Sequence, residues 1–495
     1  MDEEMTPLHG GETAAGTVSA QGQAESGSSD AGAAAVSQGE KQAEKHHKGF
    51  SSKLGFVLAA AGSAVGLGNL WRFPYLAAKY GGGIFLLCYV LLAATFGFCL
   101  LLLEIAIGRK TGKDAIGAFA SLNKKFKWFG FLCIAVPVII VPYYCVIGGW
   151  VVKYVTAFVT GDGMLLGENA TVATSQEFFV NFTADPWQPL LFFFIFIVAT
   201  IAVVMGGVQK GIERISKILM PILAVLAVFL MIYVVCQDGA GQGVADLFIP
   251  DFSEFKFETL LAALGQLFYS LSLAMAIMIT YGSYMKKDAS IPKAGLQIAV
   301  CDSTFAIMAA TIIIPSIYAF SPNPSEAISA SGPSLMFVQL PAVFNNLPGG
   351  RWIGLLFFVL VFFAALTSSI SLVETIVAVL RQNLHLKRWA ACLIVLGFAV
   401  VVGTFASLGF GVLDWVKIGD KNLLDIFDYV SNSILMPIVA IGTCIIAGYF
   451  VEEKFLMDEI GFKKKGMRKY FRIMVRYVAP LCMAAILISG LFLKL

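Results

Sequence analysis

Charged side chains are scarce in this 495-residue chain, where Asp, Glu, Lys and Arg together make up 14% of the residues. The formal net charge of +3 is too balanced to predict a nucleic-acid partner. The nine Cys show no paired ligand spacing, and most lie within apolar runs, which argues against disulfides and metal sites. We find no nucleophile, metal cluster or pair of carboxylates with hydrolase spacing, so the sequence does not predict an enzyme.

Hydrophobic residues dominate instead. They make up 58% of the chain, which includes 41 Phe. This composition predicts a polytopic membrane protein, with the bilayer as its main partner. Residues 1–48 are rich in Gly, Ala, Ser, Gln and Glu without periodicity, and they predict a disordered cytoplasmic tail. The transmembrane domain is expected over 49–495.

The apolar stretches predict an all-α fold with about eleven transmembrane helices, since about 20 apolar residues cross a bilayer core. We expect these helices at 54–78, 83–107, 128–159, 187–206, 213–236, 257–284, 294–320, 350–380, 388–408, 425–450 and 472–494. Basic residues gather in alternate connections. This pattern places the N-terminus in the cytoplasm and, after eleven spans, the C-terminus outside, with the plasma membrane as the expected location.

The first span carries Gly62, Gly66, Gly68 and Asn69, followed by Arg72, inside an otherwise apolar segment. Glycine costs about 1 kcal/mol relative to alanine in a helix interior. A charge at bilayer depth costs about 2.5 kcal/mol or more, and such residues usually mark a site. The segment therefore predicts a broken helix whose freed backbone binds a ligand.

Several acidic residues also fall within the predicted spans, with Asp302 roughly at the middle of the seventh. Glu104, Asp425 and Arg72 lie near span ends, where long side chains reach the interface. Asp302 has no such escape, so it is the strongest single functional candidate.

In the eighth span, Ala364, Thr367 and Ser368 share one helical face. A carbonyl and two hydroxyls suit a small hard cation, although Ser and Thr also serve close helix packing in membranes. Tyr144, in the third span, is either a core aromatic residue or a donor to a substrate anion. The sixth span has hydroxyls but no central glycine, and by its residues alone it predicts an unbroken helix.

Three segments together resemble the neurotransmitter:sodium symporter family, in particular its bacterial amino-acid transporters. They are AGSAVGLGNLWRFP near the start, GQLFYSLSLAMAIMITYGSY in the sixth span and ALTSSIS in the eighth. The resemblance covers about residues 50–450. It implies inverted five-helix repeats over about 50–240 and 255–450, with the first and sixth helices broken at the bilayer midplane.

The resemblance implies two sodium sites built from oxygen ligands, as a hard cation requires. The first would use the Ala64 carbonyl, Asn69, Ser270 and Asp302, together with a substrate carboxylate. The second would use the carbonyls of Gly62, Val65 and Ala364 and the hydroxyls of Thr367 and Ser368. Arg72 and Asp428 would form an extracellular gate.

The resemblance also implies an amino-acid pocket in which Tyr144 donates to the carboxylate. The expected pocket residues are Ala64, Gly66, Gly68, Ile140, Tyr144, Tyr269, Ser270, Ser272, Met275, Ser369 and Leu372. Half-helix N-termini would face the carboxylate.

Two departures from the family pattern carry information. Asp302 stands where many members have asparagine, beside the chloride position of chloride-dependent relatives near Tyr89, Gln266 and Ser270. We therefore expect its carboxylate to replace chloride. Ala274-Met275-Ala276 replaces the usual Gly-x-Gly, so we expect a tighter pocket or a less open break.

The expected function is a sodium-coupled symporter that imports a neutral amino acid by alternating access, without chloride. The alternatives are a sodium- or proton-coupled transporter of a compatible solute such as a betaine, and a substrate-gated receptor or channel. The sequence leaves the amino acid, the ion stoichiometry and the oligomeric state open, a homodimer included. It also leaves the cytoplasmic gate undefined, because His47, Phe50 and Gln382 stand where charged and Trp partners are usual.

Overall fold

The computed structural model describes residues 49–167, 170–321, 323–324, 327, 333–419 and 421–492. The tail predicted at 1–48 lies outside them. Among the described residues no β-strand forms, and only two isolated bridges occur, Gly82 with Pro250 and Ile418 with Lys421. The prediction of an all-α membrane protein is confirmed.

Nine helical segments in the described part of the chain are long and apolar enough to cross a bilayer. They are Gly83–Thr111, Lys124–Thr160, Gln188–Met205, Val208–Val235, Ile291–Phe320, Gly350–Asn383, Arg388–Leu408, Leu423–Phe450 and Lys465–Leu491. One bent pair, Lys53–Ala64 with Gly68–Lys79, passes the same test as a single broken span, which makes up to ten. The predicted sixth span, 257–284, consists of two shorter helices, Phe257–Ser270 and Ile277–Ser283, which do not pass it. The main boundary errors are at the fifth and eleventh spans, which begin at Val208 and Lys465 rather than near 213 and 472.

The individual helices follow in chain order. The first half contains α2 (Lys53–Ala64), α3 (Phe73–Lys79), α4 (Gly83–Leu92), α5 (Phe98–Thr111), α6 (Ala115–Leu122), α7 (Lys127–Thr160), α8 (Val172–Ala184), α9 (Gln188–Met205), α10 (Arg214–Val235) and α11 (Ala240–Phe248). The second contains α12 (Phe257–Ser270), α13 (Ile277–Ser283), α14 (Ile291–Phe320), α16 (Leu340–Asn345), α17 (Gly350–Asn383), α18 (Arg388–Leu408), α19 (Leu423–Asp428), α20 (Met436–Ile445), α21 (Glu453–Ile460), α22 (Lys465–Ile473) and α23 (Ala479–Phe492).

The first span is broken where the glycines predicted it. The Ser52 side chain caps α2 by accepting from the Gly55 N–H at 3.0 Å. The helix ends at Ala64, and Val65 is extended. Helical structure resumes in a π-helical turn, η1 (Gly68–Arg72), and continues as α3, so the two halves are bent by 50°.

The sixth span is also broken, between Ser270 and Ile277. Ser272, Ala274 and Ala276 have φ angles of 52°, 58° and 59°, a region that costs an L-residue about 1–2 kcal/mol. The Glu104 carboxylate of α5 accepts the Ala274 N–H at 2.7 Å and so holds the break from outside. The break implied by the family resemblance is confirmed, and the unbroken helix predicted by the residues alone is wrong.

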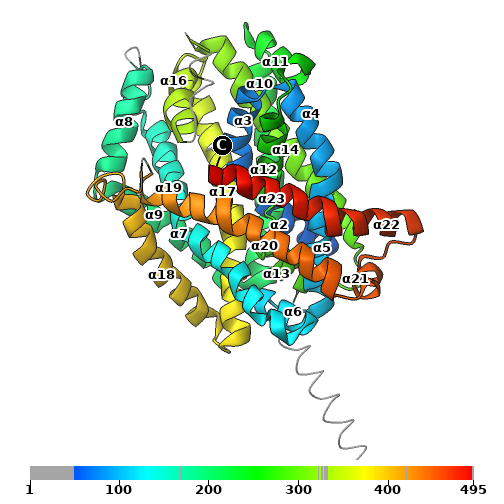
Figure 1. The fold of residues 1–495 in the computed structure, drawn as a ribbon. Helices are drawn as coiled ribbons and strands as arrows, with labels where there is room; N and C mark the ends of the chain where they lie inside the picture. The colour runs from blue at the N-terminus through cyan, green and yellow to red at the C-terminus, as the bar shows by residue number, and fades with distance from the viewer. Residues whose placement is uncertain are drawn as a thin grey trace, which may run out of the picture. The chain divides into compact units, whose positions relative to one another are not determined.

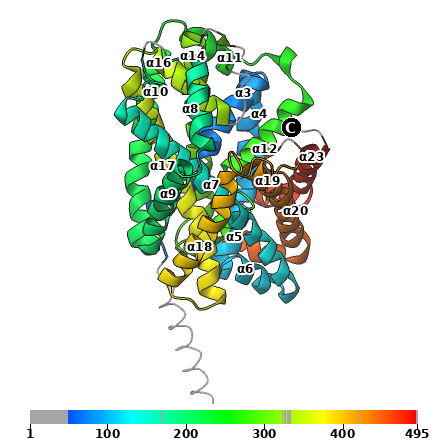
Figure 2. The same cartoon turned by 90° about the vertical axis from the view of Figure 1, so that its left-hand side faces the viewer.

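The broken helices α2, α12 and α13 pack against the other spans. α2 contacts α10, α14 and α17, α13 contacts α5 and α17, and α17 contacts α7. In Figure 1, α9 and α18 lie at one side of this group and α21 and α22 at the other; Figure 2 shows the same bundle turned by 90°. The freed backbone of both breaks is therefore shielded by helices, as unpaired groups in a membrane require.

The loops predicted to be cytoplasmic contact one another. Lys287 Nζ donates to the Arg109 carbonyl, Arg109 pairs with Glu459, Asn383 donates to Asp114, and Lys53 pairs with Asp288. The predicted outer loops meet as well, for example where Tyr233 donates to the Pro348 carbonyl and Asn345 to that of Gly167. The two sets of loops thus occupy separate ends of the bundle.

Candidate functional site

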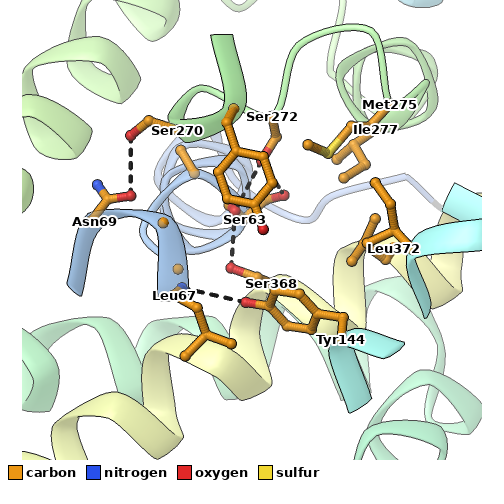
Figure 3. Close-up of a pocket in the computed structure, with 15 residues that line it drawn as sticks. Ser63, Leu67, Asn69, Tyr144, Ser270, Ser272, Met275, Ile277, Ser368 and Leu372 are labelled. Atoms are coloured by element: carbon orange, nitrogen blue, oxygen red, sulfur yellow. Dashed lines mark hydrogen bonds between the residues drawn. The ribbon is translucent and has the colours of Figure 1, made fainter. Parts of the chain in front are cut away.

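A cavity of about 350 Å³ lies between the two helix breaks. Its lining comes from both breaks and from α7 and α17, which Figure 3 shows converging on one space. The lining residues are Ser63, Ala64, Gly66, Leu67, Gly68, Asn69, Ile140, Tyr144, Tyr269, Ser270, Ser272, Met275, Ile277, Ser368 and Leu372. None of them carries a charged side chain, so the cavity suits a molecule whose own charges balance.

Polar groups concentrate where the first span is broken. The Tyr144 hydroxyl accepts the Leu67 N–H at 3.4 Å, a long bond that a better acceptor could take over (Figure 3). A Cβ on Gly66 would lie 2.6 Å from Ser368 Oγ, and one on Gly68 would lie 2.6 Å from the Tyr269 ring. Only glycine allows the backbone to approach the cavity so closely at these two positions.

A cluster of buried oxygens lies beside the cavity. The Ser270 hydroxyl is 2.7 Å from Asp302 Oδ1 and 3.0 Å from Asn69 Oδ1, and Asn69 Nδ2 donates to Asp302 Oδ1 at 2.7 Å. Tyr89 donates to the other carboxylate oxygen at 3.0 Å. Asp302 is fully buried. The carboxylate is held by neutral donors rather than by a cationic side chain, which leaves its charge available to a cation.

A second set of oxygens joins α17 to the end of α2. Ser368 Oγ lies 3.0–3.4 Å from the carbonyl oxygens of Gly62, Ser63 and Val65. Thr367 Oγ1 lies 3.0 Å from the carbonyl oxygen of Ala364. These are the five residues predicted for the second sodium site, together with Ser63. All the converging atoms are oxygens, the ligand type that a hard cation takes.

The structure differs from the predicted pocket at one position. Ser369 does not line the cavity; its hydroxyl contacts Thr200 Oγ1 at 2.9 Å and donates to the Leu366 carbonyl. Adjacent residues on a helix point about 100° apart, and it is Ser368 that faces the cavity. The other ten predicted residues all line it. Sequence reasoning missed Ser63, Leu67 and Ile277, although the first two lie inside the glycine motif.

The methyl groups of Ala274 and Ala276 do not line the cavity, whereas Met275 between them does. Both alanines are 1% exposed. The two alanines were expected to make the pocket tighter or the break less open. Because neither contacts the cavity, any such influence on the pocket would have to act through the backbone of the break.

Glu104 lies near a predicted span end, where a long side chain could reach the interface, but its side chain is buried instead. Its residue is 4% exposed, and Oε2 has no hydrogen-bond partner among the described residues. The Glu104 side chain points into the protein rather than toward the interface. There its carboxylate accepts the Ala274 N–H, in the break of the sixth span.

The predicted outer gate residues do not form an ion pair here. The Arg72 guanidinium lies over the Tyr269 ring, with its carbon 5.6 Å from the ring centroid. Asp428 accepts from Asn432 Nδ2 at 2.6 Å. A separate hollow is lined by Arg72, Asn432 and Tyr269, among others. Tyr269 also lines the cavity, so its ring lies between the cavity and this hollow.

The end of the bundle that was predicted to be cytoplasmic is closed by contacts that the sequence did not predict. Phe50 is 2% exposed and packs against Phe56, Tyr281 and Tyr284. Tyr284 donates to Glu374, which is buried and also pairs with the partly buried Arg388. Gln382 accepts the Asp114 N–H at 2.9 Å.

Glu213, at the start of the fifth span, binds the segment before α2. It accepts from the Ser51 N–H, from both the Ser51 and Ser52 hydroxyls, and from Lys217. Gln209 adds a bond to the Gly49 carbonyl at 2.7 Å. A Cβ on Gly55 would lie 2.0 Å from Glu213 Oε1, so a larger residue would have to displace the carboxylate from these hydrogen bonds.

The described residues contain no group of three or more His, Cys, Asp and Glu side chains that could hold a metal ion. The oxygen clusters draw instead on hydroxyls, an amide, carbonyls and one carboxylate. That donor set favours an alkali cation over a transition metal.

Comparison with known proteins agrees with this geometry. Residues 47–165 and 186–494 match the model of the Sodium:neurotransmitter symporter family. An uncharacterized sodium-dependent transporter of Bacillus subtilis, YhdH, is 35% identical over 449 residues, covering 89% of this chain and 97% of its own length. One from Haemophilus influenzae is 30% identical over 458 residues, with 90% and 99% covered.

A solved structure has the same fold. The crystal structure of MhsT in complex with L-phenylalanine superposes with a TM-score of 0.81 at 37% identity, covering 90% of this chain and 99% of MhsT. The fold, the sodium dependence of the relatives and the oxygen clusters point to the same class of protein.

Proposed function

The chain belongs to the Sodium:neurotransmitter symporter family, a family of sodium-dependent transporters and not of enzymes, and we propose that its cargo is a neutral amino acid. The observation that carries this proposal is the uncharged lining of the cavity. A cationic or anionic side chain would be buried there without a partner, which costs several kcal/mol. A zwitterion with a neutral side chain brings no such cost.

The side chain of the amino acid occupies the apolar part of the cavity, against Ile140, Met275, Ile277 and Leu372. MhsT, at 37% identity, has been solved with L-phenylalanine, a neutral amino acid with a large apolar side chain. The same apolar contacts also suit smaller aliphatic cargo, so the lining supports a class of substrate and leaves its size to experiment.

The carboxylate binds where the first span is broken. Tyr144 donates its hydroxyl to it, and the Leu67 N–H, now 3.4 Å from that hydroxyl, turns to the stronger acceptor. The helical segment that starts at Gly68 directs the positive end of its dipole at the same place.

Two sodium ions bind beside the cavity. The first is coordinated by Asn69, Ser270, Asp302 and the Ala64 carbonyl, and completed by the substrate carboxylate. The second is coordinated by Thr367, Ser368 and the carbonyls of Gly62, Val65 and Ala364. Because one ligand of the first ion belongs to the substrate, each strengthens binding of the other.

Transport requires no chloride. The Asp302 carboxylate accepts from Tyr89 and Ser270, two of the three side chains that surround chloride in the family pattern. A fixed negative charge at this position offsets the sodium charge, so a mobile anion is unnecessary.

The protein imports its cargo across the plasma membrane, with its N-terminus in the cytoplasm. Two sodium ions and a zwitterion carry two charges inward, each driven by about 2.3 kcal/mol per 100 mV. Arg72 and Asp428 approach one another when the cargo is bound and close the outer side, while the contacts around Phe50 and Glu374 hold the inner side shut.

The test is binding of a labelled mixture of the twenty amino acids to purified protein in sodium and in potassium, with unlabelled competitors added singly. We expect a sodium-dependent signal that one or a few neutral amino acids displace. Displacement by a betaine alone, or a signal without sodium, would contradict the proposal. Uptake currents that exceed stoichiometric uptake would indicate a channel.

A pair of tyrosine variants identifies the site within this assay. Tyr144→Phe should weaken amino-acid binding by about 10- to 150-fold, because a hydrogen bond to a charged group contributes about 1.5–3 kcal/mol. Tyr233→Phe loses an equivalent hydroxyl, bonded to the Pro348 carbonyl far from the cavity, and should bind as the wild type does.

A further inference from the structure

The segment 461–480 contains seven Lys and Arg residues and no Asp or Glu. It forms the helix α22 and the start of the eleventh span, beside α21 in Figure 1. Arg472 pairs with Glu453 and Arg468 with Asp458, whereas the exposed lysines form no ion pair among the described residues. These lysines are Lys463, Lys464, Lys465 and Lys469. The segment thus presents a net positive charge that the described protein leaves largely unbalanced.

A second cavity, of about 310 Å³, opens between this segment and residues 447–457, where the tenth span ends and the eleventh begins. Arg472 and Arg476 line it, together with Glu453, Gly448 and the apolar Val451. Arg476 Nε donates to the Gly448 carbonyl at 2.5 Å, which fixes the guanidinium in place. Its two terminal nitrogens form no hydrogen bond among the described residues, and the guanidinium carbon lies 5.5 Å from the centroid of the Tyr449 ring. The nitrogens are therefore available as donors to a ligand.

Exposed apolar residues continue from this cavity along the eleventh span. Tyr477 is 60% exposed and Leu481 is 73% exposed, and Phe450, at the end of the tenth span, is 63% exposed. In a membrane protein such side chains contact lipid tails. The cavity is therefore bounded by cationic groups at one end and by a lipid-facing surface at the other.

We propose that this cavity binds the headgroup of an anionic phospholipid. The phosphate oxygens accept from the free nitrogens of Arg476 and from Arg472, since guanidinium groups bind phosphate in a bidentate manner. The acyl chains lie along Tyr477 and Leu481. The lysines of α22 attract the negatively charged leaflet around the site. Glu453 is the one acidic side chain that lines the cavity, and its pairing with Arg472 competes with the phosphate.

The test measures lipids bound to the full-length protein by native mass spectrometry in detergent, with phosphatidylglycerol and phosphatidylcholine titrated separately. We expect phosphatidylglycerol to bind at least tenfold more tightly than phosphatidylcholine. Arg472→Gln with Arg476→Gln should weaken it about 25-fold, at about fivefold per arginine near a membrane surface. The matched control, Lys124→Gln with Lys125→Gln, removes two exposed charges from another basic loop and should change binding less than twofold.

A further variant tests the site even if the double arginine variant does not fold. Glu453→Gln removes the competing carboxylate and should tighten phosphatidylglycerol binding severalfold. Unchanged or weaker binding in Glu453→Gln would overturn the proposal, as would equal losses in the arginine pair and the lysine pair. Displacement of the lipid by millimolar inorganic phosphate would assign the cavity to a soluble anion instead.

Discussion

Replacing both Ala274 and Ala276 by glycine should leave stability almost unchanged, although two buried methyl groups are removed. Their φ angles of 58° and 59° each cost alanine about 1–2 kcal/mol, which glycine does not incur. Two effects oppose this gain. Glycine makes the unfolded chain more flexible, which lowers the free energy of unfolding by about 0.4–1 kcal/mol, and the lost burial of one methyl group lowers it by about 0.8 kcal/mol. The net change is therefore within about 1 kcal/mol at each site.

The matched control makes the same chemical change inside a regular helix. Ala309 and Ala310 lie in α14 and are 1% and 0% exposed. Replacing both by glycine should lower stability by about 3–4 kcal/mol, since each glycine costs about 1 kcal/mol in a helix interior and about 0.8 kcal/mol in lost burial. The two double variants differ in backbone conformation and not in composition.

The assay is unfolding by denaturant or heat in one detergent with saturating sodium, followed by intrinsic fluorescence. The control pair should unfold several degrees below the wild type and the break pair within a few degrees of it. If both pairs lose the same stability, the left-handed conformation of the break is wrong. We also expect the break pair to accept bulkier neutral amino acids, because glycine lets the backbone around Met275 adopt more conformations.

Three further outcomes are expected. Asn69→Ala should raise the sodium concentration needed for half-maximal substrate binding severalfold at saturating substrate, and unaltered sodium dependence would contradict the first ion site. Replacing chloride by gluconate should leave wild-type uptake unchanged, whereas Asp302→Asn should make uptake depend on chloride; wild-type uptake that collapses in gluconate would refute the role of that carboxylate. Glu374→Gln should destabilise the protein by about 1.5–3 kcal/mol in thermal unfolding, because the partly buried Arg388 loses its charged partner and keeps only its bond to the Val204 carbonyl.

The sequence predicted the fold from two physical signals. Apolar runs of sufficient length located the spans, and glycines located the break in the first. The sixth break left no such signal, because its left-handed positions are occupied by Ser272, Ala274 and Ala276. Only the family resemblance implied it. The conformation is held by a contact from another span, that of Glu104 with the Ala274 N–H, and no local pattern predicts a distant carboxylate.

The pocket residues were predictable from the sequence because they belong to the motifs that carry the family resemblance. Ten of the eleven proposed pocket residues line the cavity, and the exception, Ser369, is next to Ser368, which does. The cytoplasmic side was not predictable, since its contacts join segments far apart in the chain. Glu213 and Ser51, for example, are 162 positions apart. The ion ligands and the gate remain predictions that binding experiments must test.

The contacts of Glu213 link the integrity of one helix to the position of another. The Ser52 hydroxyl both donates to Glu213 and accepts from the Gly55 N–H, so it is the cap of α2 and part of its anchor at once. If α2 leaves the fifth span, the anchor is lost and the orientation of the cap is lost with it. Undocking of the first helix and fraying of its first turn are then a single event, and amide hydrogen exchange at Gly55 would report the opening of this end of the bundle.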